Sequence, residues 1–191
     1  ASLPMLMLST QMIDVVWSGL VLAKVEKVEI DRAATPTVPL RLTYMPYSHG
    51  LLGAIVISVL MAALYALTMA DAGLPALWVV GLVCFSHWLV DLIVHDHDMP
   101  LIGNKYHVGF GLWHNRTASI ALEFGIILLG AAMLMAAGGV AFWKLGIVTA
   151  VMVGIQAISF FTAPPEKTNQ LALTMLAVFA GMIVAGFWME L

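Results

Sequence analysis

The sequence of 191 residues has very little charge and a single cysteine. Only 10% of its residues are Asp, Glu, Lys or Arg, 62% are hydrophobic, and the mean hydropathy is +0.99. Soluble domains carry about a quarter charged residues and about half apolar ones, so this composition excludes a soluble globular protein. The lone Cys84 excludes a disulfide within the chain and a zinc site built from several thiolates.

An excess of positive charge is also lacking. Eight Lys and Arg residues stand against 11 Asp and Glu residues, which gives a net charge of -3. Proteins that hold nucleic acid carry basic patches that neutralise phosphates. We therefore expect no nucleic-acid partner.

Long apolar segments are what the sequence has in abundance. A bilayer core about 30 Å thick is crossed by about 20 mostly apolar residues. Six segments of this kind are present, over residues 3–23, 50–70, 74–95, 117–137, 140–163 and 168–190, with helix-breaking Gly and Pro between close neighbours at 71–75, 138–139 and 164–165. The sequence predicts an all-α, polytopic bundle of about six spanning helices, forming a single membrane domain over residues 1–191 in contact with the lipid bilayer.

The chain begins with Ala1 and enters an apolar segment almost at once. We expect that further residues precede it in the natural protein. Residues 3–23 are too long for the core of a signal peptide, and they carry Gln11 and Asp14 too centrally. We interpret this segment as the first spanning helix.

The basic residues are distributed unevenly between the two ends of the predicted helices. All but Lys144 fall in the connections after the first, third and fifth segments, namely Lys24, Lys27, Arg32, Arg41, Lys105, Arg116 and Lys167. By the positive-inside rule these connections are cytoplasmic, and the visible N-terminus is outside. The two long connections, 24–49 and 96–116, therefore share one face, and the alternating residues 25–30 form a short interfacial strand or a solvated loop.

Polar groups inside the segments gather in the half of the membrane next to this basic face. At a rise of 1.5 Å per residue they lie roughly 6 to 13 Å from that face, in the order Asp91, Glu123, Gln156, His87 and Asp14. An isolated ionisable group in hydrocarbon costs about 2.5–3.5 kcal/mol on insertion scales. We therefore expect these side chains to face one another.

A helical face of metal-ligand residues supports this convergence. His87, Asp91 and His95 recur at i, i+4 and i+8, Asp14 lies at a similar depth, and His49 begins the second segment. Imidazole nitrogen and carboxylate oxygen are ligands for zinc, manganese and iron. The pattern predicts a divalent metal site with zinc as the first choice, while a hydrogen-bonded network without metal and a proton or ion pathway are the alternatives.

Neighbouring polar residues have simpler expected roles. Ser48 is suited to cap the helix that follows it, and the loop residues His97 and His107 are expected to be solvated. Glu123 has three possible roles: a fourth metal ligand, a general base, or an acidic side chain that interacts with the helix dipole.

Three motifs resemble a family of uncharacterised bacterial integral membrane proteins. They are Pro46-Tyr47-Ser48-His49, then Ser86-His87-Trp88-Leu89-Val90-Asp91 with His95, Asp98 and Pro100-Leu101, and then Gly109-Phe110-Gly111-Leu112-Trp113. The S-H and S-H-x-x-x-D elements are more distantly similar to the inner-membrane metal-dependent hydrolases described as LexA-binding. This resemblance, over about residues 9–123, implies a multi-pass protein of the bacterial inner membrane with one site formed by His49, His87, Asp91, His95 and Asp14. The family pattern has Ser where this chain has Gly50.

The leading hypothesis is a metal-dependent hydrolase acting at the membrane interface. In this hypothesis His49 and the H-x-x-x-D helix hold the ion, Asp14 orients a ligand, and Glu123 or Asp98 is the catalytic group that takes a proton from water. A histidine phosphatase mechanism is disfavoured, because it needs a Lys or Arg clamp on the phosphate and the arginines lie outside the motifs of that superfamily.

Two non-hydrolase functions stay open. One is a non-catalytic subunit or assembly factor of a membrane complex, and the other is an ion- or proton-conducting transporter. Ala177, Gly181 and Ala185 form a ladder of small residues on the last segment, which suits close approach by a partner protein or a second copy of the chain. The same ladder equally suits packing within its own bundle.

Overall fold

The computed structural model describes residues 1–31, 33–69 and 73–191. Its elements in chain order are α1 (Leu3–Leu22), β1 (Lys27–Ile30), β2 (Leu40–Tyr44), α2 (Leu51–Thr68), α3 (Leu74–Val94), β3 (Met99–Ile102), β4 (Lys105–Val108), the 3-10 helix η1 (Leu112–His114), α4 (Arg116–Ala137), α5 (Phe142–Phe161) and α6 (Thr168–Glu190). Within these residues, six helices are long and apolar enough to cross a membrane. The all-α, polytopic fold is confirmed, and the chain is a multi-pass membrane protein.

Local signals in the sequence explain where the helices begin and end. Pro75 lies in the first turn of α3, where its missing N–H costs no hydrogen bond. The side chain of Asn115 caps α4 by accepting from the N–H of Ala118, and α4 ends where Gly138 takes a φ of 72°. The breaker expected at 71–75 falls partly on residues 70–72, which lie outside the described residues, as does Arg32.

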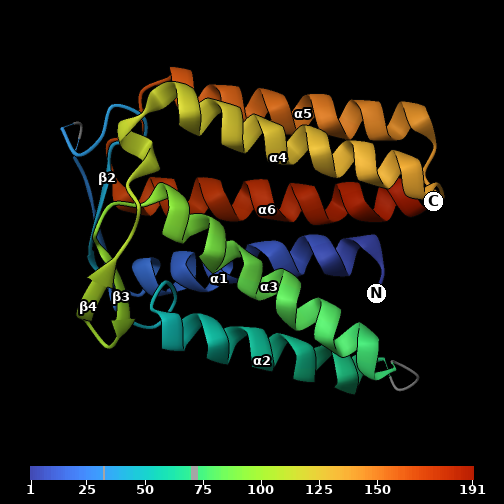
Figure 1. The fold of residues 1–191 in the computed structure, drawn as a ribbon, viewed down its shortest axis with the longest axis horizontal. Coiled ribbons are helices and arrows are strands. Elements are labelled where there is room, and N and C mark those ends of the chain that lie inside the picture. Colours follow the sequence, from blue (N-terminus) through green and yellow to red (C-terminus); the bar gives the residue numbers. More distant parts are fainter. Residues whose placement is uncertain (32, 70–72) are drawn as a thin grey trace.

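The helices form two groups on either side of α6. Helix α1 packs against α6, α3 and α2, and α2 and α3 pack closely together. Helices α4 and α5 form a hairpin on the far side of α6. The two β-hairpins lie at one end of the molecule, and both termini lie at the other (Figure 1). The two long connections therefore share one face, as expected.

The two antiparallel hairpins close the end of the α1–α3 group. β1 pairs with β2, with Val28 opposite Leu42, and β3 pairs with β4. The inward side chains of Val28, Leu42 and Met99 are buried and join the core that contains Ile13 and Trp17. Of the two interpretations of residues 25–30, the strand is the one that forms, because its alternating apolar side chains have a core to cover.

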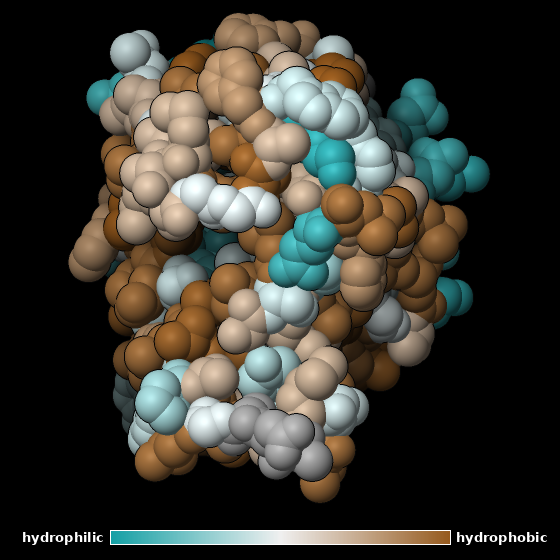
Figure 2. All heavy atoms as spheres, turned by 90° about the vertical axis from the view of Figure 1, so that its right-hand side faces the viewer, coloured by the Kyte–Doolittle hydropathy of each residue, from teal (hydrophilic) through white to brown (hydrophobic). Residues whose placement is uncertain are grey.

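The outer faces of the helices are strongly apolar. Leu60 of α2, Leu82 of α3 and Leu129 of α4 are each more than 60% exposed, and Ser119 is the one buried residue of α4. Figure 2 looks onto the end that carries both termini, where brown and pale side chains predominate and teal ones are scattered. The exposed leucines along the helices are stable against hydrocarbon rather than water, so the helices contact the lipid bilayer.

The ladder of small residues on α6 faces the hairpin of its own chain. Ala177, Gly181 and Ala185 line a groove of about 560 Å³ together with Met152 of α5 and Met7 of α1. The binding of a partner protein or of a second copy of the chain to the last helix stays a prediction.

Candidate metal centre

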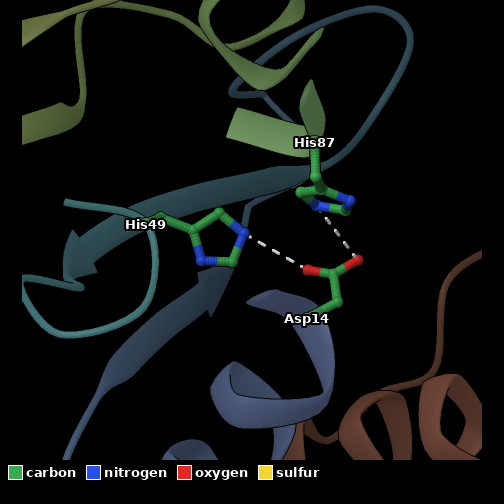
Figure 3. A group of neighbouring side chains, drawn as sticks. All are labelled: Asp14, His49 and His87. Carbon is green, nitrogen blue, oxygen red and sulfur yellow. Dashed lines mark ion pairs between the residues drawn. The ribbon is translucent and has the colours of Figure 1, made fainter. Parts of the chain in front are cut away.

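Three side chains from separate parts of the chain meet at the hairpin end of the bundle. Asp14 comes from α1, His87 from α3, and His49 from the connection before α2. The Oδ1 atom of Asp14 lies 3.2 Å from His49 Nε2, and its Oδ2 atom lies 3.6 Å from His87 Nε2 (Figure 3). One ligand atom from each residue lies within 4.8 Å of the other two. This group is close enough to bind a metal ion.

Asp91 faces the same two imidazoles. Its Oδ2 atom lies 3.6 Å from His49 Nε2 and 3.3 Å from His87 Nε2. The second contact follows from the i, i+4 spacing on α3. This oxygen is buried and has no hydrogen-bond partner within the described residues. The Nε2 atoms of both imidazoles therefore face the carboxylates of both aspartates.

A tight turn places His49 at this position. A Cβ atom at Gly50 would lie 2.5 Å from the carbonyl oxygen of Pro46, and one at Gly53 would lie 2.1 Å from that of Tyr47. Real Cβ atoms do not approach backbone oxygens so closely, so both positions need glycine. The glycines at 50 and 53 thus have a local steric cause.

Hydrogen bonds and charges fix the imidazole of His49. Its Nδ1 atom lies 2.9 Å from Ser48 Oγ, and its backbone oxygen accepts from Trp88 Nε1 at 2.9 Å. Burial acts to lower the pKa of His49, but the hydrogen bond with Asp14 and the negative charge of Asp91 outweigh it, so the pKa lies above its usual value. The surroundings of this imidazole favour positive charge.

The role expected for Ser48 as a helix cap is wrong. Gly50 occupies the cap position of α2 and makes no side-chain capping bond, while Ser48 Oγ donates to Glu26 Oε2 at 2.5 Å. Ser48 lies two residues before the cap position, and its hydroxyl group donates to a charged, buried acceptor, which makes a strong hydrogen bond.

Glu26 is a residue that the sequence analysis missed. It is 2% exposed and lies directly before β1. A signal was present, because Glu26 has the same parity as the buried Val28 in the alternating stretch 25–30. A carboxylate on the buried face of a strand needs internal hydrogen-bond donors.

A backbone carbonyl orients the second imidazole. His87 Nδ1 lies 2.8 Å from the carbonyl oxygen of Thr10 on α1. A carbonyl oxygen only accepts hydrogen bonds, so Nδ1 carries the proton. In the neutral ring, Nε2 then has a free lone pair, and this atom faces Asp14 and Asp91.

His95 and Asp98 lie beside the group of three rather than within it. His95 ends α3, and its ring centroid is 6.2 Å from that of His49. Its Nδ1 atom lies 3.7 Å from Asp98 Oδ1, and both atoms are buried without a hydrogen-bond partner among the described residues. The other oxygen of Asp98 accepts from the N–H of Leu42 at 3.1 Å.

Glu123 reaches the same region from α4. Its Oε1 atom accepts from Trp113 Nε1 at 3.2 Å, and its Oε2 atom accepts from Gln156 Nε2 on α5. The Trp113 ring packs on His95, with 4.2 Å between the ring centroids. Glu123 therefore adjoins the site through Trp113, with both of its oxygens in hydrogen bonds.

The remaining histidines lie outside the site. His97 and His107 are exposed, as expected, and His114 is exposed and pairs with Asp96 at 3.2 Å. The N–H of His97 and the side chain of His114 hold the pKa of Asp96 below its usual value. This pair belongs to the connection between α3 and α4.

Compared with models of protein families, with curated proteins and with solved structures, the chain gives no significant match. The resemblance to the hydrolase family therefore stays a prediction from the motifs. Function has to be argued from the chemistry of the site.

Proposed function

We propose that the chain is a metal-dependent hydrolase of the membrane interface, in which Asp14, His49 and His87 hold a divalent ion with Asp91 beside them. The observation that carries the proposal is the convergence of two imidazole Nε2 atoms on two largely buried carboxylates. Each Nδ1 atom already has a partner outside the group. The Nε2 atoms are thus the ones available as ligands.

The charge of the group supports a divalent cation. Two ionised carboxylates in a poorly solvated place repel each other, and neutral imidazoles do not offset their charge. A divalent ion would balance both carboxylates. Two ring protons would balance them as well, and this is the hydrogen-bonded network without metal that the experiment below distinguishes.

The donor set points to zinc as the first choice. Two imidazole nitrogens with carboxylate oxygens are typical of zinc, while manganese and iron accept the same ligands. Thr10 and Ser48 correspond to the outer groups that orient ligating histidines in metal centres.

A bound divalent ion would polarise a substrate oxygen and lower the pKa of water. Of the two carboxylates proposed as proton acceptors, Asp98 has a buried oxygen without a hydrogen-bond partner among the described residues, whereas both oxygens of Glu123 are occupied. We therefore favour Asp98 as the base, within a site completed by His95.

The position of the site supports a substrate that arrives from the membrane. Asp14 lies eight residues from the end of α1, which is roughly 12 Å at 1.5 Å per residue. An ester or phosphoester carried by a lipid would bring its polar group to this depth. The resemblance and the basic connections support a place in the bacterial inner membrane with the site on the cytoplasmic side.

Metal content tests the proposal directly. Elemental analysis of protein purified in detergent should find about one divalent ion per chain in the unaltered protein and in His107→Ala, which changes an exposed histidine. The same analysis should find no ion in His87→Ala. Hydrolysis of p-nitrophenyl acetate and p-nitrophenyl phosphate, measured before and after chelation, should fall without metal and recover when zinc is added.

Absence of metal from the unaltered protein would refute the hydrolase proposal. In that case the cluster is a structural network, and the complex-subunit alternative takes its place. His87→Ala should then lower the thermal stability in detergent, because Asp91 would lose a partner inside the protein.

A further inference from the structure

A buried carboxylate outside the metal group is linked to His49 by hydrogen bonds. The Oε1 atom of Glu26 accepts from the backbone N–H groups of Tyr47 at 2.8 Å and Ser48 at 3.0 Å. Its Oε2 atom accepts from Ser48 Oγ, and Ser48 Oγ in turn lies 2.9 Å from His49 Nδ1. Glu26, Ser48 and His49 thus form a continuous chain of hydrogen bonds that leads to the site.

The direction of each hydrogen bond in this chain follows from the groups involved. An ionised carboxylate only accepts, and a serine hydroxyl has one proton to donate. Because Ser48 donates that proton to Glu26, its oxygen can only accept from His49. His49 Nδ1 must therefore carry a proton, and in the neutral ring the lone pair is on Nε2, the atom that faces Asp14.

We propose that Glu26 is a positioning residue that, through Ser48, fixes His49 in the tautomer whose Nε2 atom can bind metal. The effect on metal binding rests on the proposed function, whereas the tautomer is a property of the polypeptide itself. His87 receives the same tautomer from the carbonyl oxygen of Thr10. A side-chain relay at His49 and a backbone group at His87 thus prepare two equivalent ligands.

A single substitution reverses the relay while it preserves the shape of the side chain. In Glu26→Gln, the amide oxygen still accepts from Tyr47 and Ser48, but the amide nitrogen donates to Ser48 Oγ. The Ser48 hydroxyl then donates to His49 Nδ1, and the ring proton moves to Nε2. A protonated Nε2 cannot ligate a metal ion, so the variant loses one ligand without a cavity.

The tautomer is measured by ¹⁵N NMR of the histidine side chains in metal-free, full-length protein at alkaline pH, where the imidazole is neutral. We expect the proton on Nδ1 of His49 in the unaltered protein and on Nε2 in Glu26→Gln. Glu29→Gln is the matched control, because it makes the same chemical change on the exposed face of β1. This control should keep the original tautomer.

Zinc titration of the same proteins gives the second readout. Glu26→Gln should weaken zinc binding by about 10- to 100-fold, the range for outer groups that orient a ligand, and Glu29→Gln should leave it unchanged. Should Glu26→Gln fail to fold, Ser48→Ala and Ser48→Thr repeat the test. Loss of the hydroxyl should weaken binding, and a threonine hydroxyl should restore it.

The outcomes separate this inference from the hydrolase proposal. A proton on Nε2 in the unaltered protein, or an unchanged tautomer in Glu26→Gln, overturns the positioning role. Unchanged zinc affinity in Ser48→Ala overturns it as well. A tautomer that switches in a protein without zinc affinity supports the relay and refutes the metal centre.

Discussion

The group α1–α3 and the hairpin α4–α5 differ in how their polar side chains within the membrane are paired. In α1–α3, Asp14, Asp91 and His87 leave ligand atoms facing one another. In the hairpin, Gln156 donates to Glu123, and the Arg116 guanidinium donates to the carbonyl oxygen of Phe160 at 2.9 Å. The first arrangement concentrates charge that needs a cation or protons, whereas the second satisfies each polar group locally.

The two regions also differ in packing, because the α1–α3 group contains the main core and the hairpin is hardly buried. The main core is built from α1, α2, α3 and α6 with the β-hairpins, and it includes the fully buried Ile13, Ala54 and Cys84. In α4, Ser119 alone is buried among the residues described for that helix. A cluster of charged side chains has to be held by a rigid, packed surround, while a pair whose hydrogen bonds are made locally tolerates lipid around it.

The largest effect should come from a methyl group added to the turn that carries His49. Gly53→Ala places a Cβ atom 2.1 Å from the carbonyl oxygen of Tyr47, whereas Gly125→Ala on α4 meets no atom within 4 Å. Gly53→Ala should destabilise the protein by about 3 kcal/mol or prevent folding. Gly125→Ala should stabilise it by about 0.5–1 kcal/mol.

Thermal unfolding in detergent, followed by circular dichroism, measures both glycine variants. Equal melting temperatures would show that the turn is no more constrained than the exposed hairpin.

Metal binding should separate the carboxylates of the two regions. Asp91→Asn removes charge beside both imidazoles and should weaken zinc binding by about 10- to 100-fold. Glu123→Gln should leave zinc affinity unchanged, because both oxygens of Glu123 are held by Trp113 and Gln156. Zinc titration of the two variants checks this difference, and an equal loss would mean that Glu123 is itself a ligand.

A smaller difference is expected between two tryptophans. Trp88→Phe removes the donor to the backbone oxygen of the buried His49 and should cost about 1–3 kcal/mol of stability. Trp143→Phe, at an exposed position of α5 beside Lys144, should cost about 0.5–1 kcal/mol through a weaker cation–π contact. Chemical denaturation in mixed micelles measures both losses of stability. A larger loss in Trp143→Phe than in Trp88→Phe would contradict the importance of the hydrogen bond to the His49 backbone.

The smallest effect concerns the connection between the two regions. The pKa of Asp96 is held below its usual value by the N–H of His97 and by His114. A lowered pKa in the folded state stabilises the protein at pH above the ordinary carboxyl range, and this contribution disappears as the pH falls through the lowered value. Because the pair is exposed, it is worth about 0.5 kcal/mol or less. Asp96→Asn should reduce the loss of unfolding free energy between pH 6 and pH 3 by that amount, and thermal unfolding at each pH measures the difference.

Much of the fold was predictable because the signals for it are local. The six apolar segments and the breakers between them predict α1 to α6 with ends that differ by at most two residues. The organisation of the chain as one domain stays a prediction. On α3, the spacing of His87 and Asp91 determines that their side chains lie on one face, whatever the rest of the chain does.

The partners of each ligand were not predictable in the same way. Asp14 was expected to lie in the same site because of its depth in the membrane, but depth alone could not show that its carboxylate lies against both imidazoles. Ser48 was assigned to a helix end and instead bonds Glu26, which is 22 residues away in sequence. Periodicity fixes the face of one helix, but it contains no information about which loop packs against that face.

By itself, the sequence determined that the chain enters a membrane and that its ionisable groups must converge, because hydrophobicity and helical period act within single segments. The tertiary structure decided which atoms meet. The packing of α1 on α3 brings the Thr10 carbonyl to His87, and the turn at Gly50 brings Ser48 and His49 to Glu26. These contacts join distant segments, and only the packing of the helices and hairpins selects them.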